Sequence, residues 1–140
     1  MLYNRNTEKR IKEPFNHVSW MHKQLKLTNF VLQQCLFGLH LVNTISKSDT
    51  ICIVESEKTA IIKSLLIPDF LWLATGSKTG FKEEILAPVR KYKIIAYPDK
   101  TEFSKWNATT QLFNKKGFQI ECSQLLENLE IEDGGDLVDF

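Results

Sequence analysis

The sequence predicts an α/β protein of Rossmann-like type, with a mostly parallel sheet of four strands and helices on both faces. Four short apolar runs, at residues 50–54, 70–74, 93–97 and 118–122, alternate with segments of helical character. Strands separated by crossover helices pair in parallel, through right-handed connections. The chain has 140 residues, of which 43% are hydrophobic and 25% charged, so we expect one soluble domain with one core.

The first strand and the first helix of this series have clear boundaries. The run TICIV at 50–54 is β-branched, too short for a helix and apolar enough for a central parallel strand. Glu55 and Ser56 end this strand. The run EKTAIIKSLL at 57–66 then predicts a helix, which Pro68 stops.

A glycine-containing turn connects the second strand to the middle of the chain. Residues 70–74, FLWLA, predict a buried strand, and residues 75–81, TGSKTGF, predict the turn. The turn lacks the spacing of a phosphate-binding P-loop. A short helical piece is expected at 82–89, and it leads into the third strand, KIIAY at 93–97.

The last helix and the last strand complete the predicted sheet. A helix is expected over residues 103–116, with Gly117 as the left-handed residue that follows its end. The fourth strand, FQIEC, is expected at 118–122. The residues of this helix that we expect to face the core are Trp106, Leu112 and Phe113.

The chain is expected to divide into three parts. Residues 1–48 form a basic arm and a helical extension, residues 49–122 the α/β core, and residues 123–140 a short helix and an acidic tail. Within the extension, residues 15–26 have loosely helical apolar spacing. Residues 30–42 predict either a second, buried helix or a strand-like edge segment.

Charge is distributed unevenly, although the formal net charge is only +1. Residues 1–26 hold six basic and two acidic residues, whereas residues 121–140 hold seven acidic residues and no lysine or arginine. The basic arm permits a polyanionic partner, and Arg10 and Lys12 are candidate nucleic-acid contacts. We interpret Trp20 as a core residue, with stacking on a base as the alternative.

The composition argues against several other classes of protein. No apolar run approaches the roughly 20 residues that span a bilayer. The first residues lack the apolar core of a signal peptide, so a cytoplasmic location is expected. Cys35, Cys52 and Cys122 are far apart, which argues against a disulfide framework and a cysteine zinc site. We interpret them as small buried residues in a reducing compartment.

Polar residues follow the predicted strands, at the positions where open α/β sheets bind ligands. Glu55 and Glu57 follow the first strand, and Asp99 and Glu102 follow the third. If these two strands are neighbours, Glu55 and Asp99 face one crevice, and two or three carboxylates there would bind Mg²⁺. The alternative is a solvated strand end, with Glu57 as an acid favoured by the helix dipole.

Three runs of the sequence, ICIVESEKTAIIKSL, FLWLATGSKTG and IIAYPDKTEFSKW, resemble the Toprim domain of bacterial primases and topoisomerases. The resemblance is greatest to Toprim-containing, primase-like proteins of Bacteroides-type bacteria and their mobile elements, and it spans about residues 30–140. Glu55 matches the glutamate of that family, with Ser56 where glycine is usual. Gly76 and Gly80 match its glycine turn.

The acidic motif of that family is incomplete in this sequence. Asp99 matches the first aspartate of an Asp-x-Asp pair, whereas Thr101 occupies the place of the second and Glu102 comes one residue late. The terminal DGGDLVDF resembles the acidic ending that follows many primase-type Toprim domains. We interpret this segment as a solvated acidic tail, and the alternative that the resemblance implies places Asp136 and Asp139 near the site.

The resemblance implies a module for Mg²⁺-dependent nucleotidyl or phosphoryl transfer on nucleic acid, with single-stranded DNA favoured. Glu55 is then the acid–base group, and Asp99 is a metal ligand. Glu57 or Glu102 is then an auxiliary ligand. The candidate phosphate contacts are Lys58, Lys78 and Lys100.

Two alternative functions stay open at this point. A Toprim-derived binding module that has lost catalysis with Thr101 would work with other domains or proteins of a replication or mobilisation complex. A small α/β protein of another family would bind a nucleotide or an acidic partner. The placement of Glu55 relative to Asp99 discriminates best between these possibilities.

Overall fold

The structure of the chain is a computed structural model that describes residues 2, 4–7, 11–46 and 49–139. Contacts between Cα atoms divide the chain into two compact units, Met1–Gln33 and Gln34–Phe140. The boundary falls before residue 34 because the segment that follows contacts the sheet. The second unit contains all of the described strands and every described helix except one.

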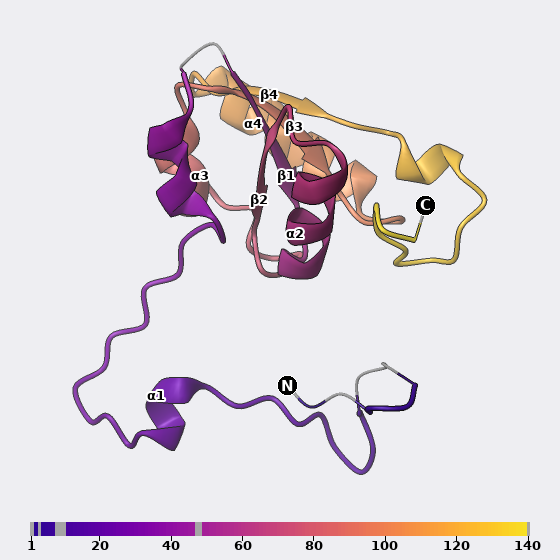
Figure 1. The fold of residues 1–140 in the computed structure, drawn as a ribbon. Helices are drawn as coiled ribbons and strands as arrows, with labels where there is room; N and C mark the ends of the chain where they lie inside the picture. Colours follow the sequence, from indigo (N-terminus) through magenta and orange to yellow (C-terminus); the bar gives the residue numbers. More distant parts are fainter. Residues whose placement is uncertain (1, 3, 8–10, 47–48, 140) are drawn as a thin grey trace. The chain divides into compact units, whose positions relative to one another are not determined.

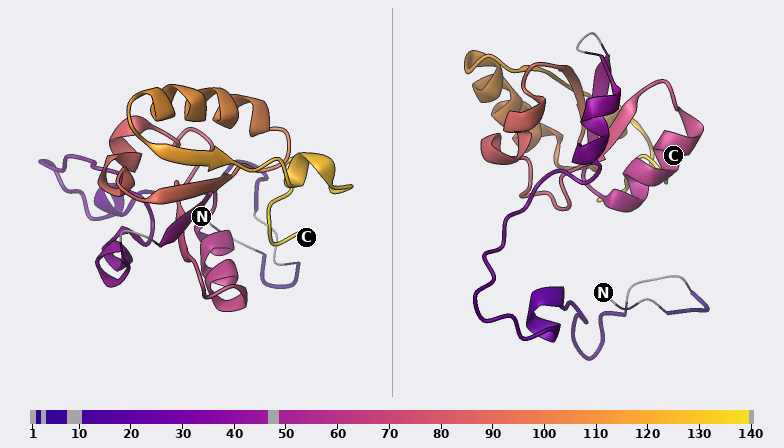
Figure 2. Two further views of the ribbon diagram at one scale, coloured as in Figure 1. Left: turned by 90° about the horizontal axis from the view of Figure 1, so that it is seen from above. Right: turned by 60° about the vertical axis from the view of Figure 1, so that its left-hand side comes forward.

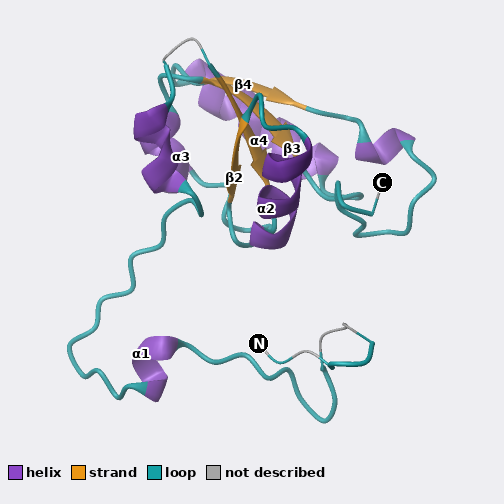
Figure 3. Cartoon of the chain, viewed as in Figure 1, coloured by secondary structure: helices purple, strands orange, loops and turns teal. Residues whose placement is uncertain are grey.

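A four-stranded, all-parallel sheet forms the centre of the second unit, which confirms the predicted fold class (Figures 1 and 3). The order of the strands is β2-β1-β3-β4, so β1 and β3 are direct neighbours. Each strand begins and ends within one residue of its predicted bounds. The strands are β1 (Thr50–Val54), β2 (Leu71–Ala74), β3 (Lys93–Tyr97) and β4 (Gln119–Cys122).

Helices cover both faces of this sheet (Figure 2). Successive side chains of a strand point to opposite faces. Ile51 and Ile53 of β1 therefore pack with α4 on one face, whereas Cys52 and Val54 pack with Ala60 of α2 on the other. The helices of the sheet unit are α2 (Glu57–Leu66), α3 (Glu83–Leu86), α4 (Phe103–Lys115) and the 3-10 helices η1 (Leu39–Thr44), η2 (Ala87–Val89) and η3 (Leu126–Asn128).

The packing of α4 corrects one core prediction and confirms two. Trp106 and Phe113 are buried, as expected, and Gly117 follows the helix with φ +87°. Leu112 is 57% exposed, so its predicted inward orientation is wrong. It precedes Phe113 by one residue, a rotation of about 100°, and therefore faces solvent when Phe113 faces the sheet.

The interpretation of the three cysteines as buried residues is confirmed for Cys52, holds in part for Cys122 and is wrong for Cys35. Cys52 is buried, and burial raises the pKa of its thiol to about 12. Cys122 is half-buried, and burial raises the pKa of its thiol to about 11. Cys35 is exposed, so its interpretation as a buried residue is wrong.

Residues 34–46 lie against the edge of the sheet, where Phe37 forms an isolated antiparallel bridge with Ala74 of β2. The Phe37 N–H donates to the Ala74 carbonyl at 2.8 Å, and Gly38 follows with φ +80°. Leu36 and Val42 of this segment are buried in the core. The buried helix expected over residues 30–42 is therefore wrong, and the alternative of an edge segment is correct at Phe37.

The first unit is mostly loop, with α1 (Met21–Gln24) as its one helix within the described residues. The helix expected over residues 15–26 is therefore wrong except for this single turn. No residue of α1 is buried, and Trp20 is 42% exposed, so the interpretation of Trp20 as a core residue is also wrong. A short amphipathic segment needs a packing partner to remain helical, and the first unit supplies none among its described residues.

Candidate functional site

Glu55 and Asp99 lie together at the carboxyl edge of the sheet. Val54 of β1 pairs with Tyr97 of β3, so the residues that follow these two strands leave the same edge side by side. Side-chain hydrogen bonding and charge couple the two carboxyl groups directly. The condition for this prediction, that β1 and β3 are neighbours, is confirmed, and Glu55 and Asp99 follow these strands at the same edge of the sheet.

The surroundings of the two carboxyl groups raise the pKa of both. Burial, the charges of Glu55 and Asp136 and the hydrogen bond to Glu55 together raise the pKa of Asp99 to about 7. Burial also raises the pKa of Glu55, and the charge of Glu102 acts in the same direction, whereas the backbone N–H of Lys78 and the hydrogen bond from Asp99 oppose the shift. The two groups therefore form a coupled pair, in which the pKa of Asp99 lies near neutral pH.

The glycine turn after β2 holds its backbone against Glu55. Gly76 donates its N–H to the Glu55 carbonyl at 2.9 Å, and Thr75 donates to the Val54 carbonyl at 3.0 Å. Gly80 allows the turn to close, because a Cβ atom there would lie 2.3 Å from the Thr75 carbonyl oxygen. The turn therefore extends the pairing of β1 and β2 past the strand ends and brings the Lys78 N–H to Glu55.

The C-terminal segment contributes two further carboxylates to this edge. The charges of Asp136 and Asp139 both raise the pKa of Asp99. Asp136 is held by the Thr59 hydroxyl of α2, which donates to it at 2.7 Å, and by the Lys58 ammonium at 3.9 Å. The interpretation of these two aspartates as a solvated tail is thus replaced by the alternative, which places them near the site.

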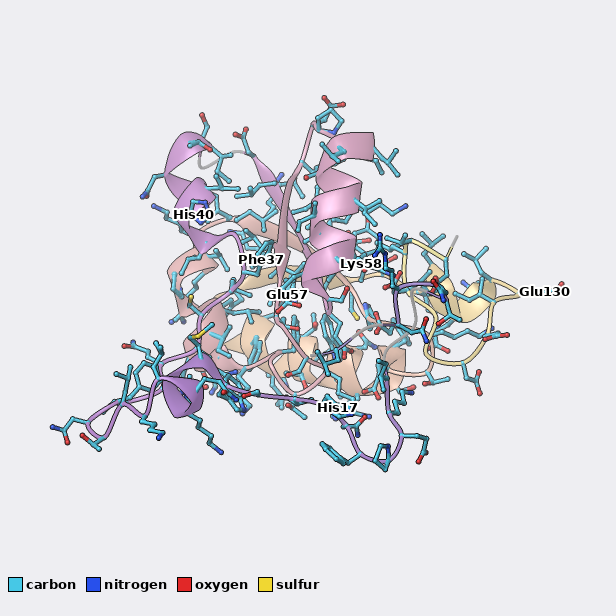
Figure 4. All side chains as sticks on the ribbon, turned by 60° about the horizontal axis from the view of Figure 1, so that its bottom comes forward. His17, Phe37, His40, Glu57, Lys58 and Glu130 are labelled. Atoms are coloured by element: carbon cyan, nitrogen blue, oxygen red, sulfur yellow. The ribbon has the colours of Figure 1, made fainter. Side chains whose placement is uncertain are left out.

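The remaining acidic candidates occupy different positions. Glu102 lies near enough for its charge to raise the pKa of Glu55, and its carboxylate pairs with Lys78 at 3.4 Å and with Lys105 at 3.9 Å. Glu57 is exposed at the start of α2 (Figure 4). Its carboxylate lies beside Gly76, where an added Cβ atom would be 3.2 Å from the Glu57 Oε1 atom. The structure therefore brings Glu102, but not Glu57, to the Glu55–Asp99 pair.

Two of the predicted phosphate contacts flank the carboxylates, and one does not. The side chains of Lys58 and Lys78 are 62% and 59% exposed, at Asp136 and at Glu102 respectively. Figure 4 labels Lys58 at the start of α2, near the C-terminal segment. The Lys100 ammonium instead donates to the carbonyls of Leu129 and Ile131, at 2.7 and 2.8 Å. The Lys100 ammonium is thus hydrogen-bonded to the backbone of the C-terminal segment, so Lys100 does not have the position predicted for a phosphate contact.

The predicted contacts of the basic arm lie in the first unit. Lys12 is exposed there, and Arg10 lies outside the described residues. From Pro14 to Ser46 the sequence has no acidic residue, and the aromatic side chains of this stretch include the exposed Phe15, Trp20 and Phe30. Phe30 stacks on His22 with ring centroids 4.5 Å apart.

Thr101, two residues after Asp99, has a strained backbone. Its φ is +79°, a left-handed conformation that is costly for a β-branched residue. Its N–H donates at 2.7 Å to Glu127, which also accepts from the Phe103 N–H at 3.3 Å. Glu127 therefore holds the turn and caps the start of α4, because Glu102 provides no side-chain cap there.

Mg²⁺ requires oxygen ligands, and the carboxylates at this edge of the sheet are ligands of that kind. Within residues 2, 4–7, 11–46 and 49–139, no three His, Cys, Asp or Glu side chains are close enough together to hold a metal ion. Mg²⁺ is nevertheless commonly held by only one or two carboxylates, with waters or phosphates as its other ligands. Glu55 and Asp99 follow adjacent strands at one edge of the sheet, and the charge of Asp136 acts on Asp99. Oxygen donors of the kind that Mg²⁺ takes from a protein are therefore present at this edge.

Two residues of the site were missed by the sequence analysis. Thr59 appears in the sequence as an ordinary helix residue, and Glu127 as one acid among seven in the acidic tail. Thr59 is 1% exposed, and its hydroxyl also bonds the Ser56 hydroxyl at 2.9 Å. A buried threonine in the first turn of a helix is a weak signal, and Glu127 carries no signal in the sequence.

The fold and the carboxylates define a Rossmann-like α/β domain with an acidic site at the carboxyl ends of its parallel strands. The chain belongs to the family described as Domain of unknown function (DUF6371), which it matches over residues 1–100. That match includes Glu55 and Asp99 and ends before β4. Comparison with curated proteins and with solved structures finds no match. None of the helices in the described residues is long and apolar enough to cross a membrane.

Proposed function

We propose that this chain is a Toprim-like, primase-related module for Mg²⁺-dependent nucleotidyl or phosphoryl transfer on nucleic acid. The observation that carries the proposal is the direct coupling of Glu55 and Asp99 at the ends of adjacent parallel strands. Asp136 adds a third negative charge to the pair, and Lys58 and Lys78 flank it. Carboxylates that are bordered by exposed lysines suit a substrate that carries both a metal ion and phosphates.

Each residue of the site has a role in this proposal. When bound, Mg²⁺ supplies charge neutralisation for the transferring phosphoryl group. Asp99 would hold the ion, with Asp136 as the candidate second carboxylate. Glu55 accepts the proton of an attacking hydroxyl. Lys58 and Lys78 leave their carboxylate partners to meet phosphate oxygens, because both exposed ion pairs are worth little in water.

Nucleic acid is the proposed partner because of the first unit as well as the site. Its acid-free stretch combines exposed lysines with exposed aromatic rings, a composition that binds single-stranded DNA through phosphate contacts and base stacking. Lys12, Lys23 and Lys26 are the described basic residues of this stretch and its N-terminal border. We propose a cytoplasmic location and other replication or mobilisation proteins as further partners.

The Glu55→Gln variant tests the proposed activity. We expect the wild type to extend or join nucleotides on a single-stranded DNA template with Mg²⁺. The variant should lose about 10²–10⁴-fold in rate, as removal of a general base does. The control is Glu84→Gln, an exposed glutamate of α3 that should leave the rate unchanged. Equal rates for the wild type and Glu55→Gln would overturn the catalytic role.

A second candidate function is a nucleic-acid binding module that has lost catalysis. The observation that favours it is Thr101, which provides no carboxylate and whose N–H is bound to Glu127.

Binding of a labelled oligothymidylate distinguishes this second candidate from the first. For a binding module we expect affinity that falls with salt, at a slope of about −0.7 per phosphate contact, and that EDTA leaves unchanged. Thr101→Asp should then restore transfer, since aspartate tolerates the left-handed backbone better than threonine. Binding that requires Mg²⁺ would contradict the binding-module function.

A further inference from the structure

Two side chains connect the turn that follows β3 with the C-terminal segment. One belongs to the turn and bonds the segment, and the other belongs to the segment and bonds the turn. From the turn, the Lys100 ammonium donates to the carbonyls of Leu129 and Ile131, at 2.7 and 2.8 Å. From the segment, Glu127 accepts the N–H groups of Thr101 and Phe103, at 2.7 and 3.3 Å. We name this reciprocal pair, Lys100 and Glu127, the clasp.

Backbone hydrogen bonds also join the turn to the C-terminal segment, next to the site. Lys100 donates its N–H to the Gly135 carbonyl at 2.9 Å, and its own carbonyl accepts the Gly134 N–H at 3.2 Å. Glycine is required at both positions. Gly134 has φ +78°, and a Cβ on Gly135 would lie 2.9 Å from the Glu132 carbonyl oxygen. The backbone next to Asp99 is thus bonded to the residue that precedes Asp136.

The chemistry of the clasp indicates positioning. Residues 121–140 hold seven carboxylates, yet Lys100 bonds two neutral backbone carbonyls, which fix direction more than they neutralise charge. Lys100 and Glu127 are both half-buried, and three of their four bonds, those of Lys100 and the one from the Phe103 N–H, are partly shielded from water. Glu127 also bonds the turn at Thr101, where the backbone is left-handed and needs an external partner to persist.

We propose that Lys100 and Glu127 are positioning residues that hold Asp136 and Asp139 against Asp99, so that the C-terminal segment is an integral part of the carboxylate site. The inference rests on the proposed function for its cation, which Asp99 would ligate while the charges of Asp136 and Asp139 act on the same carboxyl group. Neither clasp residue touches the substrate. Both act through the backbone that carries Asp99 and Asp136.

The test compares Lys100→Met with Lys115→Met in the full chain. Lys115 is an exposed lysine at the end of α4. We expect amide hydrogen exchange of residues 129–139 to be about 10-fold faster in Lys100→Met. We also expect its affinity for Mn²⁺, measured by electron paramagnetic resonance, to be about 10-fold lower, as for the loss of an outer-shell partner. Lys115→Met should resemble the wild type.

Two further variants keep the inference testable if Lys100→Met fails to fold. Lys100→Arg retains donors for both carbonyls and should recover most of the Mn²⁺ affinity. Glu127→Gln retains an acceptor for the Thr101 N–H and should have a smaller effect than Glu127→Ala. Faster exchange in Lys100→Met or Glu127→Ala with unchanged Mn²⁺ affinity would overturn the positioning role. A wild type that binds no Mn²⁺ would overturn the proposed function instead, while the exchange rates still decide whether the clasp holds the segment.

Discussion

An Asp99→Asn variant is expected to bind Mn²⁺ about 100-fold or more weakly than the wild type and, without metal, to be more stable than the wild type at pH 8. The first effect follows from the loss of a carboxylate that would ligate the cation directly, since outer-shell losses alone cost 10–100-fold. The second follows from the pKa of Asp99, which burial and the neighbouring charges raise to about 7.

The sign of the pH dependence follows from linkage. In the unfolded chain Asp99 ionises near its ordinary pKa of 3.8, whereas in the fold it holds its proton up to about pH 7. The wild type therefore loses stability as pH rises from about 4 through 7. The full shift corresponds to about 4 kcal/mol, and solvent screening at this half-buried carboxyl reduces the expected loss to about 1–2 kcal/mol. Asparagine carries no charge to be desolvated, so the variant avoids this loss.

Urea unfolding at pH 5 and at pH 8, in the presence of EDTA, measures this effect. The difference in the free energy of unfolding between Asp99→Asn and the wild type should be small at pH 5 and favour the variant at pH 8. Asp69→Asn is the matched control, because Asp69 is exposed in the turn before β2. A stability difference that is the same at both pH values would contradict the raised pKa of Asp99.

The second large effect is expected in the core, where Trp106→Ala should lower the free energy of unfolding by about 3–5 kcal/mol. Trp106 is 1% exposed and stacks on Phe81, with ring centroids 4.3 Å apart and planes at 13°. It joins α4 to the segment after the glycine turn, so its truncation leaves a cavity beneath the site. Urea unfolding followed by circular dichroism measures the loss, because tryptophan fluorescence changes with the substitution.

Trp106→Phe separates packing from hydrogen bonding at the same position. The indole N–H is buried and has no hydrogen-bond partner among the described residues, so phenylalanine removes an unpaired donor. We therefore expect Trp106→Phe to cost about 1 kcal/mol or less, because the ring can still stack on Phe81. Leu112→Ala, on the solvent side of the same helix, should change stability by no more than about 0.5 kcal/mol. Equal losses for the alanine and phenylalanine variants at Trp106 would contradict this account.

The sheet and its helices were predictable because each element carries its own local signal. The strands TICIV and KIIAY are short, β-branched and apolar, and the structure has them at Thr50–Val54 and Lys93–Tyr97. The helix Glu57–Leu66 begins after Ser56, whose hydroxyl accepts the Thr59 N–H at 3.1 Å, and it ends before Pro68. Each of these signals involves residues that are only a few positions apart, so it can be recognised from the sequence.

The helix over residues 15–26 of the first unit was predicted wrongly because apolar residues at helical spacing occur both in segments that form packed helices and in segments that stay exposed. Val18, Met21 and Leu25 recur at helical intervals, yet they are exposed and only Met21–Gln24 is helical. Apolar spacing makes a helix stable only where another surface buries the apolar side chains. That condition depends on contacts, and the spacing of residues within the segment does not reveal it.

The sequence by itself determined which carboxylates are available at the strand ends, namely Glu55 after β1 and Asp99 after β3. The tertiary structure alone decided that β1 and β3 are neighbours, and so that the charge of Glu55 acts on Asp99 and raises its pKa. It also decided the place of Asp136, which lies 77 residues from its partner Thr59 along the chain. The physical reason is the range of the interactions: turns and caps are chosen by adjacent residues, whereas strand order and the path of the C-terminal segment follow from packing across the whole domain.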